Sequence, residues 1–287
     1  NKKNLKEDEV QTAVFHNRFI GAREGVSSDI VLLGCPLDIT SSFRAGSRFG
    51  PEGLRRASWA LETYSPYLDM DLEDIDFSDS GDLELPPGNL PGSLDMIEQA
   101  SGDIAGASRK PLFFGGEHLV TYPVIKGMKT VFPALQIVHF DAHCDLRDDY
   151  EGQKLSHATV MKRVQELGGI TLHQIGVRSG TRQEFKELQA VGSPAGLKER
   201  LKPGIPVYIS FDIDVFDPSL VPGVTTPEPG GLSFKEVADY FQARRGAKVV
   251  GADFVELAPD YDSTFVSCVC GAKVAREMIM LIGSGAV

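Results

Sequence analysis

The sequence has few cysteines and no long apolar run. Its four cysteines, Cys35, Cys144, Cys268 and Cys270, are too sparse among 287 residues for a disulfide framework, and no second pair completes a zinc site. We therefore expect four small, buried side chains. No apolar stretch reaches 18 residues, which argues against a transmembrane helix. The first seven residues are polar and charged rather than signal-like, so we expect a cytoplasmic protein.

The sequence also has fewer basic than acidic residues. Lys and Arg number 29 against 40 Asp and Glu, which gives a formal net charge of −11. Such a chain is a poor partner for nucleic acid or an anionic membrane, and we expect neither; it favours cations instead. The composition, 42% hydrophobic and 24% charged, excludes collagen, coiled coil and wholesale disorder. Because no repeat or linker is evident, we expect one domain spanning residues 1–287.

Short apolar runs alternate with amphipathic stretches along the chain. We expect strands at 29–35, 111–114, 135–140, 170–176, 207–211 and 248–255. We expect helices at 51–64, 122–132, 156–167, 181–191, 233–244 and 263–282. The acidic segment 69–91 is interpreted as an irregular surface excursion. Strand–helix alternation predicts an α/β protein, a three-layer α/β/α sandwich with a mostly parallel central sheet.

Coordinating side chains follow four of these strands, at the point where each strand ends. They are His118, then Asp141, His143 and Asp145, then Asp212 and Asp214, and last Glu256. Ligand sites of open parallel sheets form at the carboxyl ends of strands. In extended backbone, alternate residues point to the same side. We therefore expect the side chains within each group to share a side and the groups to converge.

Apart from Glu256, this set comprises four carboxylates and two imidazoles. Four buried carboxylates cannot all stay ionised without compensating cations. An oxygen-rich set with imidazole and without facing thiolate suits Mn²⁺ better than a closed structural zinc site. Six ligands exceed the need of one ion, so we infer two metals. Such a pair lowers the pKa of a shared water and gives hydroxide at neutral pH.

Three other histidines and one loop are weaker candidates. We interpret His16, His139 and His173 as structural; His139 faces the same side as Asp141 by parity but lies deeper in its strand. The loop 46–50 precedes a helix and could hold an anion. It lacks a phosphate-cradling pattern, so we do not assign it a ligand.

At these residues the chain resembles the arginase and agmatinase (ureohydrolase) family. The resemblance spans about residues 34–282 and rests on segments 115–118, 141–145, 210–218, 227–232 and 254–256. It implies an arginase-like fold, two Mn²⁺ per subunit and a homo-oligomer, a trimer or hexamer. By resemblance, one ion is held by His118, Asp141, Asp145 and Asp212. The other is held by Asp141, His143, Asp212 and Asp214, with Asp141 and Asp212 bridging.

Within the family, segments 145–150 and 154–158 are similar to those of agmatinases. The resemblance implies hydrolysis of agmatine to putrescine and urea, with hydroxide attacking the guanidinium carbon. Asp145 would accept the proton and pass it to the leaving amine. Glu256 would orient the guanidinium, and His157 would contact the substrate or shuttle protons.

The sequence departs from the common family pattern at three positions. Leu119, Cys144 and Thr225 stand where Ser, Thr and Gly are frequent. None of these changes removes a ligand, so they bear on substrate fit and on the hydrogen bonds around the ligands.

Several alternatives remain open. Arg147, where arginases tend to carry Asn, could bind a carboxylate and favour guanidinobutyrate; Asp148 and Asp149 could instead receive a distal ammonium, as in agmatine or aminopropylagmatine. Arginine is a further candidate substrate. A metal-dependent phosphoesterase would need a basic clamp, for which Arg147 and Arg178 are the visible residues. A non-catalytic, metal-stabilised scaffold is the alternative of another class.

Overall fold

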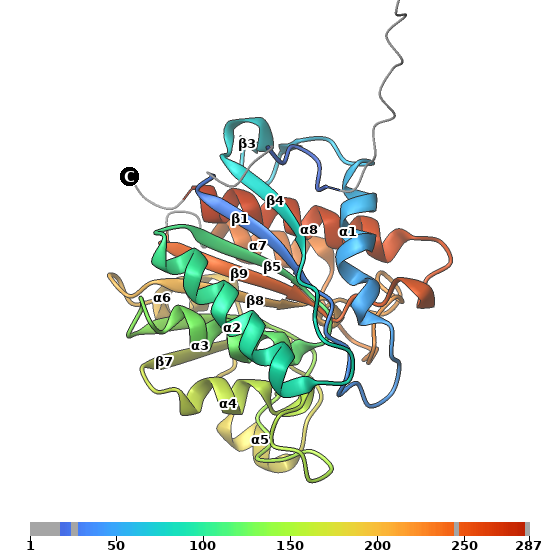
Figure 1. The fold of residues 1–287 in the computed structure, drawn as a ribbon, viewed down its shortest axis with the longest axis vertical. Coiled ribbons are helices and arrows are strands. Elements are labelled where there is room, and N and C mark those ends of the chain that lie inside the picture. The colour runs from blue at the N-terminus through green and yellow to red at the C-terminus, as the bar shows by residue number, and fades with distance from the viewer. Residues whose placement is uncertain (1–17, 24–27, 244–246, 285–287) are drawn as a thin grey trace, which may run out of the picture.

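A seven-stranded sheet forms the centre of the computed structural model, which describes residues 18–23, 28–243 and 247–284 (Figure 1). In spatial order its strands are β4 (Phe77–Asp82), β1 (Ile30–Cys35), β5 (Lys110–Gly115), β9 (Val249–Val255), β8 (Val207–Asp212), β6 (Leu135–Phe140) and β7 (Ile170–Ile175). Every neighbouring pair in this sheet is parallel. The expected parallel sheet is therefore confirmed.

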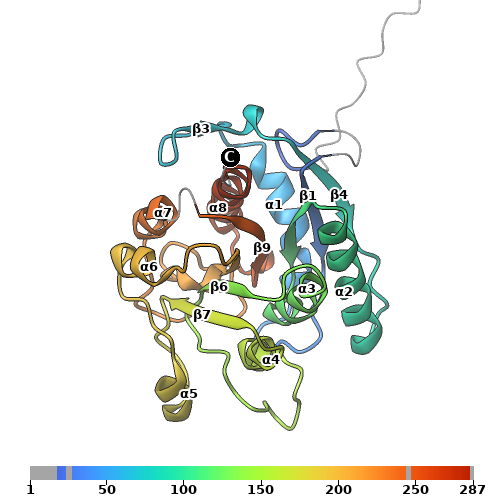
Figure 2. The same ribbon diagram turned by 90° about the vertical axis from the view of Figure 1, so that its left-hand side faces the viewer.

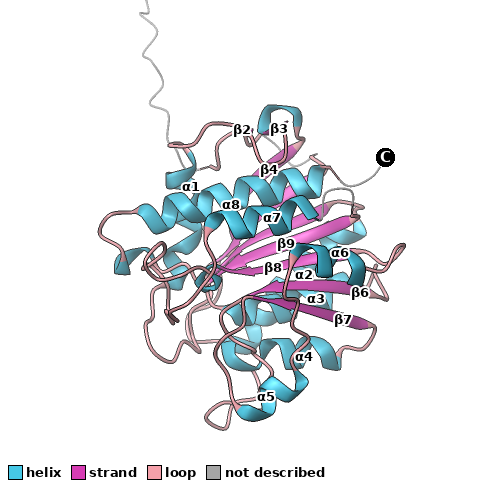
Figure 3. Ribbon diagram, turned by 180° about the vertical axis from the view of Figure 1, so that it is seen from behind, coloured by secondary structure: helices cyan, strands magenta, loops and turns pink. Residues whose placement is uncertain are grey.

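Helices cover both faces of the sheet (Figures 1 and 3). One face carries α2 (Leu90–Gly106), α3 (Thr121–Met128) and α4 (Val160–Glu166). The other carries α1 (Gly50–Ser58), α6 (Pro194–Arg200), α7 (Phe234–Ala243) and α8 (Val266–Gly283). The short helix α5 (Arg182–Glu187) lies beyond the edge strand β7 (Figure 2). This is the expected three-layer α/β/α sandwich.

Both faces of the central strands are buried, which explains their continuous apolar runs. In β8 the side chains of Ile209 and Phe211 join the core under α7 and α8, whereas Tyr208 joins the core under α2 and α3. The Phe211 ring lies 5.1 Å from that of Phe140 and 5.7 Å from that of Phe254, between centroids. Strands buried on both sides show no polar alternation, so only their ends can carry a solvent-accessible site.

The interpretation of residues 69–91 as irregular is wrong. This segment contains β3 (Met70–Asp71), which pairs with β2 (Tyr64–Ser65) in a two-stranded ribbon, and it contains the sheet's edge strand β4. The sequence Phe-Ser-Asp-Ser-Gly-Asp of β4 has one apolar residue, so hydropathy does not reveal it. Its carboxylates bind Arg55 of α1 instead: Asp79 lies 2.8 Å and Asp82 2.5 Å from the guanidinium.

Other differences concern helices. Helices α2 and α6 are not among the expected elements; each begins with a proline in its first turn, and α2 contains three glycines that weaken its helical pattern. The helix expected at 181–191 ends at Glu187, because the backbone of 189–191 pairs with Gln174 of β7. The helix expected at 233–244 begins as expected, with a reciprocal bond between Ser233 and Glu236.

Some expectations fall on residues outside the described ranges. These are the polar N-terminal segment, His16 and the end of the helix expected at 244. Within the described ranges, none of the helices combines the length and apolarity needed to cross a membrane. All four cysteines are buried free thiols, as expected.

Candidate active site

The predicted site residues all lie at one edge of the sheet. The four strands that precede them, β5, β9, β8 and β6, are neighbours in the sheet, so their carboxyl ends meet. His118 begins the 3₁₀ helix η3 (His118–Val120), and Asp214 lies in the 3₁₀ helix η5 (Ile213–Val215) that follows β8. The structure thus brings together segments that are up to 138 residues apart in sequence, as His118 and Glu256 are.

The expectation of extended backbone between these residues is wrong, although the side chains converge. Asp145 has a left-handed φ of 55°, and η5 coils the chain between Asp212 and Asp214. Convergence comes from hydrogen bonds instead. The Oδ1 atoms of Asp141, Asp212 and Asp214 accept from the backbone N–H of His143, Asp214 and Ala142 at 2.5, 2.8 and 3.0 Å. Each carboxylate is thereby anchored through Oδ1.

The second oxygens meet around the ring of His118. Nδ1 of His118 lies 3.1 Å from Asp141 Oδ2, 3.0 Å from Asp212 Oδ2 and 3.3 Å from Asp145 Oδ2. Its other ring nitrogen, Nε2, lies 3.1 Å from Ser210 Oγ. Because Ser210 donates its own proton to Asp253 at 2.9 Å, its oxygen accepts from Nε2. Nδ1 is then the ring nitrogen that faces the three carboxylates, and it is the atom left to bind a metal ion.

A second group of ligand atoms adjoins the first. Nδ1 of His143 lies 3.0 Å from Asp214 Oδ2 and 3.4 Å from Asp141 Oδ1. Asp141 belongs to both groups, one oxygen to each. Among the described residues, His118 Nδ1 and Asp214 Oδ2 are buried polar atoms that make no hydrogen bond. Such orphaned lone pairs in an oxygen-rich pocket fit a pair of divalent cations.

The electrostatics favour positive charge at both positions. Burial opposes protonation of His118, but the carboxylates of Asp141 and Asp212 outweigh it and raise its pKa well above the ordinary value. The balance for His143 is the same, with Asp214 and Asp141 raising its pKa. Burial raises the pKa of Asp145 well above its usual range, and the charge of Asp141 adds to this. Bound cations would relieve the same imbalance.

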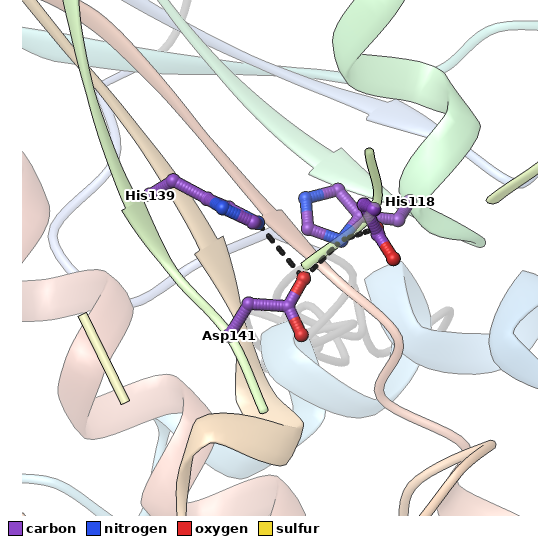
Figure 4. A group of neighbouring side chains, drawn as sticks. His118, His139 and Asp141 are labelled. Carbon is purple, nitrogen blue, oxygen red and sulfur yellow. Dashed lines mark hydrogen bonds and ion pairs between the residues drawn. The ribbon is translucent and has the colours of Figure 1, made fainter. Parts of the chain in front are cut away.

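His139 contacts this cluster, so its interpretation as a purely structural residue is incomplete. Its Nε2 lies 2.8 Å from Asp141 Oδ2, opposite His118 (Figure 4). Its Nδ1 faces the side-chain amide of Gln174 at 3.2 Å. The ring is fully buried, and burial lowers its pKa. Strand parity was the signal for this contact, since His139 and Asp141 are two residues apart.

A cavity of about 270 Å³ opens above the cluster. His118, His143, Asp145 and Asp212 line it together with Glu256 and His157. The cavity is therefore bounded by four of the predicted ligands and by both other predicted catalytic residues. Asp141 and Asp214 lie behind this surface, almost fully buried.

His157 enters the cavity from the start of the 3₁₀ helix η4 (His157–Thr159), which Ser156 caps. Its Nε2 lies 3.3 Å from Ser42 Oγ, and its backbone N–H donates to Thr40 Oγ1 at 3.0 Å. Burial lowers the pKa of His157 to about 4, so the imidazole is neutral at pH 7.

Glu117 was not predicted as a site residue. Its buried carboxylate accepts from the Thr40 N–H at 2.6 Å and so fixes the loop that carries Thr40.

Glu256 follows β9 with a left-handed φ of 66°. One carboxylate oxygen accepts from the backbone N–H of His118 at 2.7 Å, and the other accepts from the hydroxyl of Thr225. Burial raises the pKa of Glu256 to about 8. A cation in the cavity would therefore favour its ionised form.

The residues that line the cavity wall are not the two, Asp148 and Asp149, that the sequence suggested for the substrate tail. Asp148 is exposed and lies 3.5 Å from Lys162, Asp149 accepts from a backbone N–H in its own turn, and neither lines the cavity. Glu184 lines it instead, 96% buried, and lies 3.6 Å from Arg147. The sequence does not indicate this role for Glu184, because Glu184 also fits the pattern of a residue that caps α5.

The basic clamp required by the phosphoesterase alternative does not form. Arg178 donates to backbone carbonyls, including that of Asp214 at 2.8 Å and that of Glu228 at 2.6 Å, and it does not line the cavity. Arg147 lines the cavity but lies against Glu184 and over the ring of Tyr150. The geometry therefore disfavours a phosphate substrate.

Known proteins share both sequence and fold with this chain. The model of the arginase family matches residues 28–281. An agmatinase of Bacillus subtilis is 45% identical over 275 residues, covering 91% of this chain and 95% of its own, and one of Bacillus anthracis is 44% identical over 265 residues, covering 88% and 91%. The structure of an agmatine ureohydrolase of Thermoplasma volcanium superimposes with a TM-score of 0.85 at 29% identity, covering 96% and 97%.

Proposed function

The chain belongs to the arginase family, and from this premise we propose that it is a dinuclear metal hydrolase that converts agmatine to putrescine and urea. The observation that carries the proposal is the pair of adjoining ligand groups that share Asp141 beneath the cavity. Relatives named agmatinase support the choice of substrate. The test is urea and putrescine release from agmatine by the metal-loaded protein.

We propose that His118, Asp141, Asp145 and Asp212 hold one ion and that Asp141, His143, Asp212 and Asp214 hold the other. When bound, the metal pair supplies an activated water at neutral pH. Two buried atoms without a hydrogen bond, His118 Nδ1 and Asp214 Oδ2, support this ligand set, because each lies about 3 Å from another proposed ligand: His118 Nδ1 is 3.0 Å from Asp212 Oδ2, and Asp214 Oδ2 is 3.0 Å from His143 Nδ1.

Three residues of the chain would act on the substrate itself. Glu256 would bind the planar guanidinium through its carboxylate, a geometry that allows two parallel N–H···O bonds. Asp145, whose buried carboxyl favours holding a proton, would accept one and release it to the leaving amine. His157 is neutral at pH 7 and so could donate or accept a hydrogen bond near the departing nitrogen.

The cavity wall supports a substrate with a cationic tail. Glu184 places a buried carboxylate there, and the side chain of Arg147 is directed to it rather than left unpaired. A carboxylate-tailed substrate such as guanidinobutyrate would have to compete with Glu184 for Arg147. We therefore propose agmatine ahead of guanidinobutyrate, arginine and aminopropylagmatine.

We also propose Mn²⁺ as the metal, because the donors are carboxylate oxygens and imidazole nitrogens without a thiolate. The proposal extends to one domain over residues 1–287, a cytoplasmic location and a homo-oligomer, a trimer or hexamer. Metal analysis, light scattering and cell fractionation test these points separately.

A further inference from the structure

The hydroxyl of Thr225 contacts the carboxylate that would bind the guanidinium. Thr225 is 97% buried, and its Oγ1 donates to Oε2 of Glu256. The neighbouring Val224 forms a backbone bridge with Leu257, the residue after Glu256. The segment that carries Thr225 is therefore fixed to the segment that carries Glu256, so the hydroxyl has little freedom to leave its acceptor.

Glu256 is held from two sides. Oε1 accepts from the His118 N–H and Oε2 accepts from Thr225, so each oxygen has one fixed donor. A carboxylate oxygen offers about two acceptor positions, which leaves one on each oxygen for a guanidinium. The backbone is held as well, because the Glu256 N–H donates to Gly116 at 2.8 Å. Two donors fix the plane of the carboxylate, and a planar guanidinium requires that plane to be fixed.

We propose that Thr225 is a positioning residue, which orients Glu256 so that both of its oxygens face the guanidinium of the substrate. The inference rests on the proposed function, since it needs Glu256 to bind the guanidinium. Without the hydroxyl, the carboxylate would keep only the His118 donor and could rotate about its last side-chain bond. Thr226 provides no equivalent donor, because its Oγ1 lies 3.4 Å from Thr225 Oγ1 and no bond links it to Glu256.

The test compares Thr225→Val, which keeps the shape and removes the hydroxyl, with Thr225→Ser, which keeps the hydroxyl. Steady-state kinetics with agmatine are measured on the Mn²⁺-loaded proteins. We expect Thr225→Val to lower kcat/KM by about 10- to 100-fold, the range for a lost hydrogen bond to a charged group, with a raised KM. We expect Thr225→Ser to restore most of the loss.

The raised KM separates positioning from damage to the fold. A partly unfolded or metal-depleted preparation would lower kcat in proportion to the lost sites and leave KM unchanged. Thr130→Val, which removes a hydroxyl bound to Gly127 outside the cavity, is the control for the substitution itself. If Thr225→Val has wild-type KM and kcat, the inference is wrong, whereas a wild-type protein without urea release would contradict the proposed function instead.

Discussion

Ser210 lies between the ring of His118 and the carboxylate of Asp253, and it sets the tautomer of the histidine. Its oxygen is 3.1 Å from His118 Nε2, and its hydroxyl donates to Asp253 at 2.9 Å. With Nε2 protonated, Nδ1 offers its lone pair toward Asp141, Asp145 and Asp212. A metal-binding histidine is oriented through its other nitrogen in the same way.

Replacing Ser210 with Ala should weaken metal binding about 10- to 100-fold, because the His118 ring loses the acceptor that fixes its tautomer. Titration of the metal-free protein with Mn²⁺ by calorimetry measures the effect. Ser101→Ala is a matched control, since Ser101 is a buried serine that donates to Val124 in another part of the core. Equal affinity in Ser210→Ala and wild type would show that Ser210 does not orient the ligand.

Asp141→Ala should lose metal and activity together. Asp141 gives one oxygen to each ligand group, so the loss of this one side chain affects both positions. Metal content is measured by mass spectrometry beside urea release. Asp148→Ala, an exposed carboxylate outside the cavity, should keep both. Retained turnover with stoichiometric manganese in Asp141→Ala would overturn the ligand assignment.

Glu184→Gln should raise the KM for agmatine while leaving that for butylguanidine, which has no terminal ammonium, nearly unchanged. We expect this because the proposed function has the buried Glu184 carboxylate at the cavity wall meet the cationic tail of agmatine and not its guanidinium. Both substrates are assayed on one preparation, so a change in folding would affect them equally. An equal change in both KM values would exclude Glu184 as the site of the tail.

His157 should make the protein less stable as the pH falls from about 6.5 to about 4. Its pKa is lowered to about 4 by burial, against about 6.5 in an unfolded chain. In that interval the unfolded state binds more protons, so the free energy of unfolding rises with pH and is lost on acidification. Thermal melting of wild type and His157→Asn between pH 7 and pH 4.5 measures this.

The variant lacks the titrating group, so its melting temperature should fall less over the same interval. The carboxylates titrate in both proteins and cancel in the comparison. Parallel curves for the two proteins would mean that His157 has an ordinary pKa in the folded state.

The central strands and the convergence of the candidate ligands could be predicted from the sequence, because each strand and each group of coordinating residues carries its own signal. The apolar run 135–140 followed by Asp141-Ala142-His143-Cys144-Asp145 is an example. Strand β4 could not be predicted from the sequence, because its acidic residues form ion pairs with Arg55 instead of alternating with a hydrophobic face. The roles proposed for Glu184 and Thr225 depend on contacts with residues distant in sequence, and these contacts exist only once the loops are folded.

The local backbone was the least predictable part of the site. In an extended chain, Asp141, His143 and Asp145 would point to the same side. In the structure, however, the backbone of Asp145 has a left-handed φ, and η5 is a 3₁₀ helix. The side chains still meet, because in each of three aspartates a backbone N–H group anchors one carboxylate oxygen. The sequence pattern thus predicted which side chains meet, while tertiary hydrogen bonds determined how they meet.

The most direct test of the proposed function is urea release by the Mn²⁺-loaded protein with agmatine, arginine and 4-guanidinobutyrate assayed side by side. The predicted result is strong preference for agmatine, with one putrescine formed per urea. Preference for 4-guanidinobutyrate or arginine would contradict the role given to Glu184 and Arg147 while keeping the hydrolytic centre. Absence of urea from all three, with two manganese ions bound, would contradict the proposed function and favour the metal-stabilised scaffold.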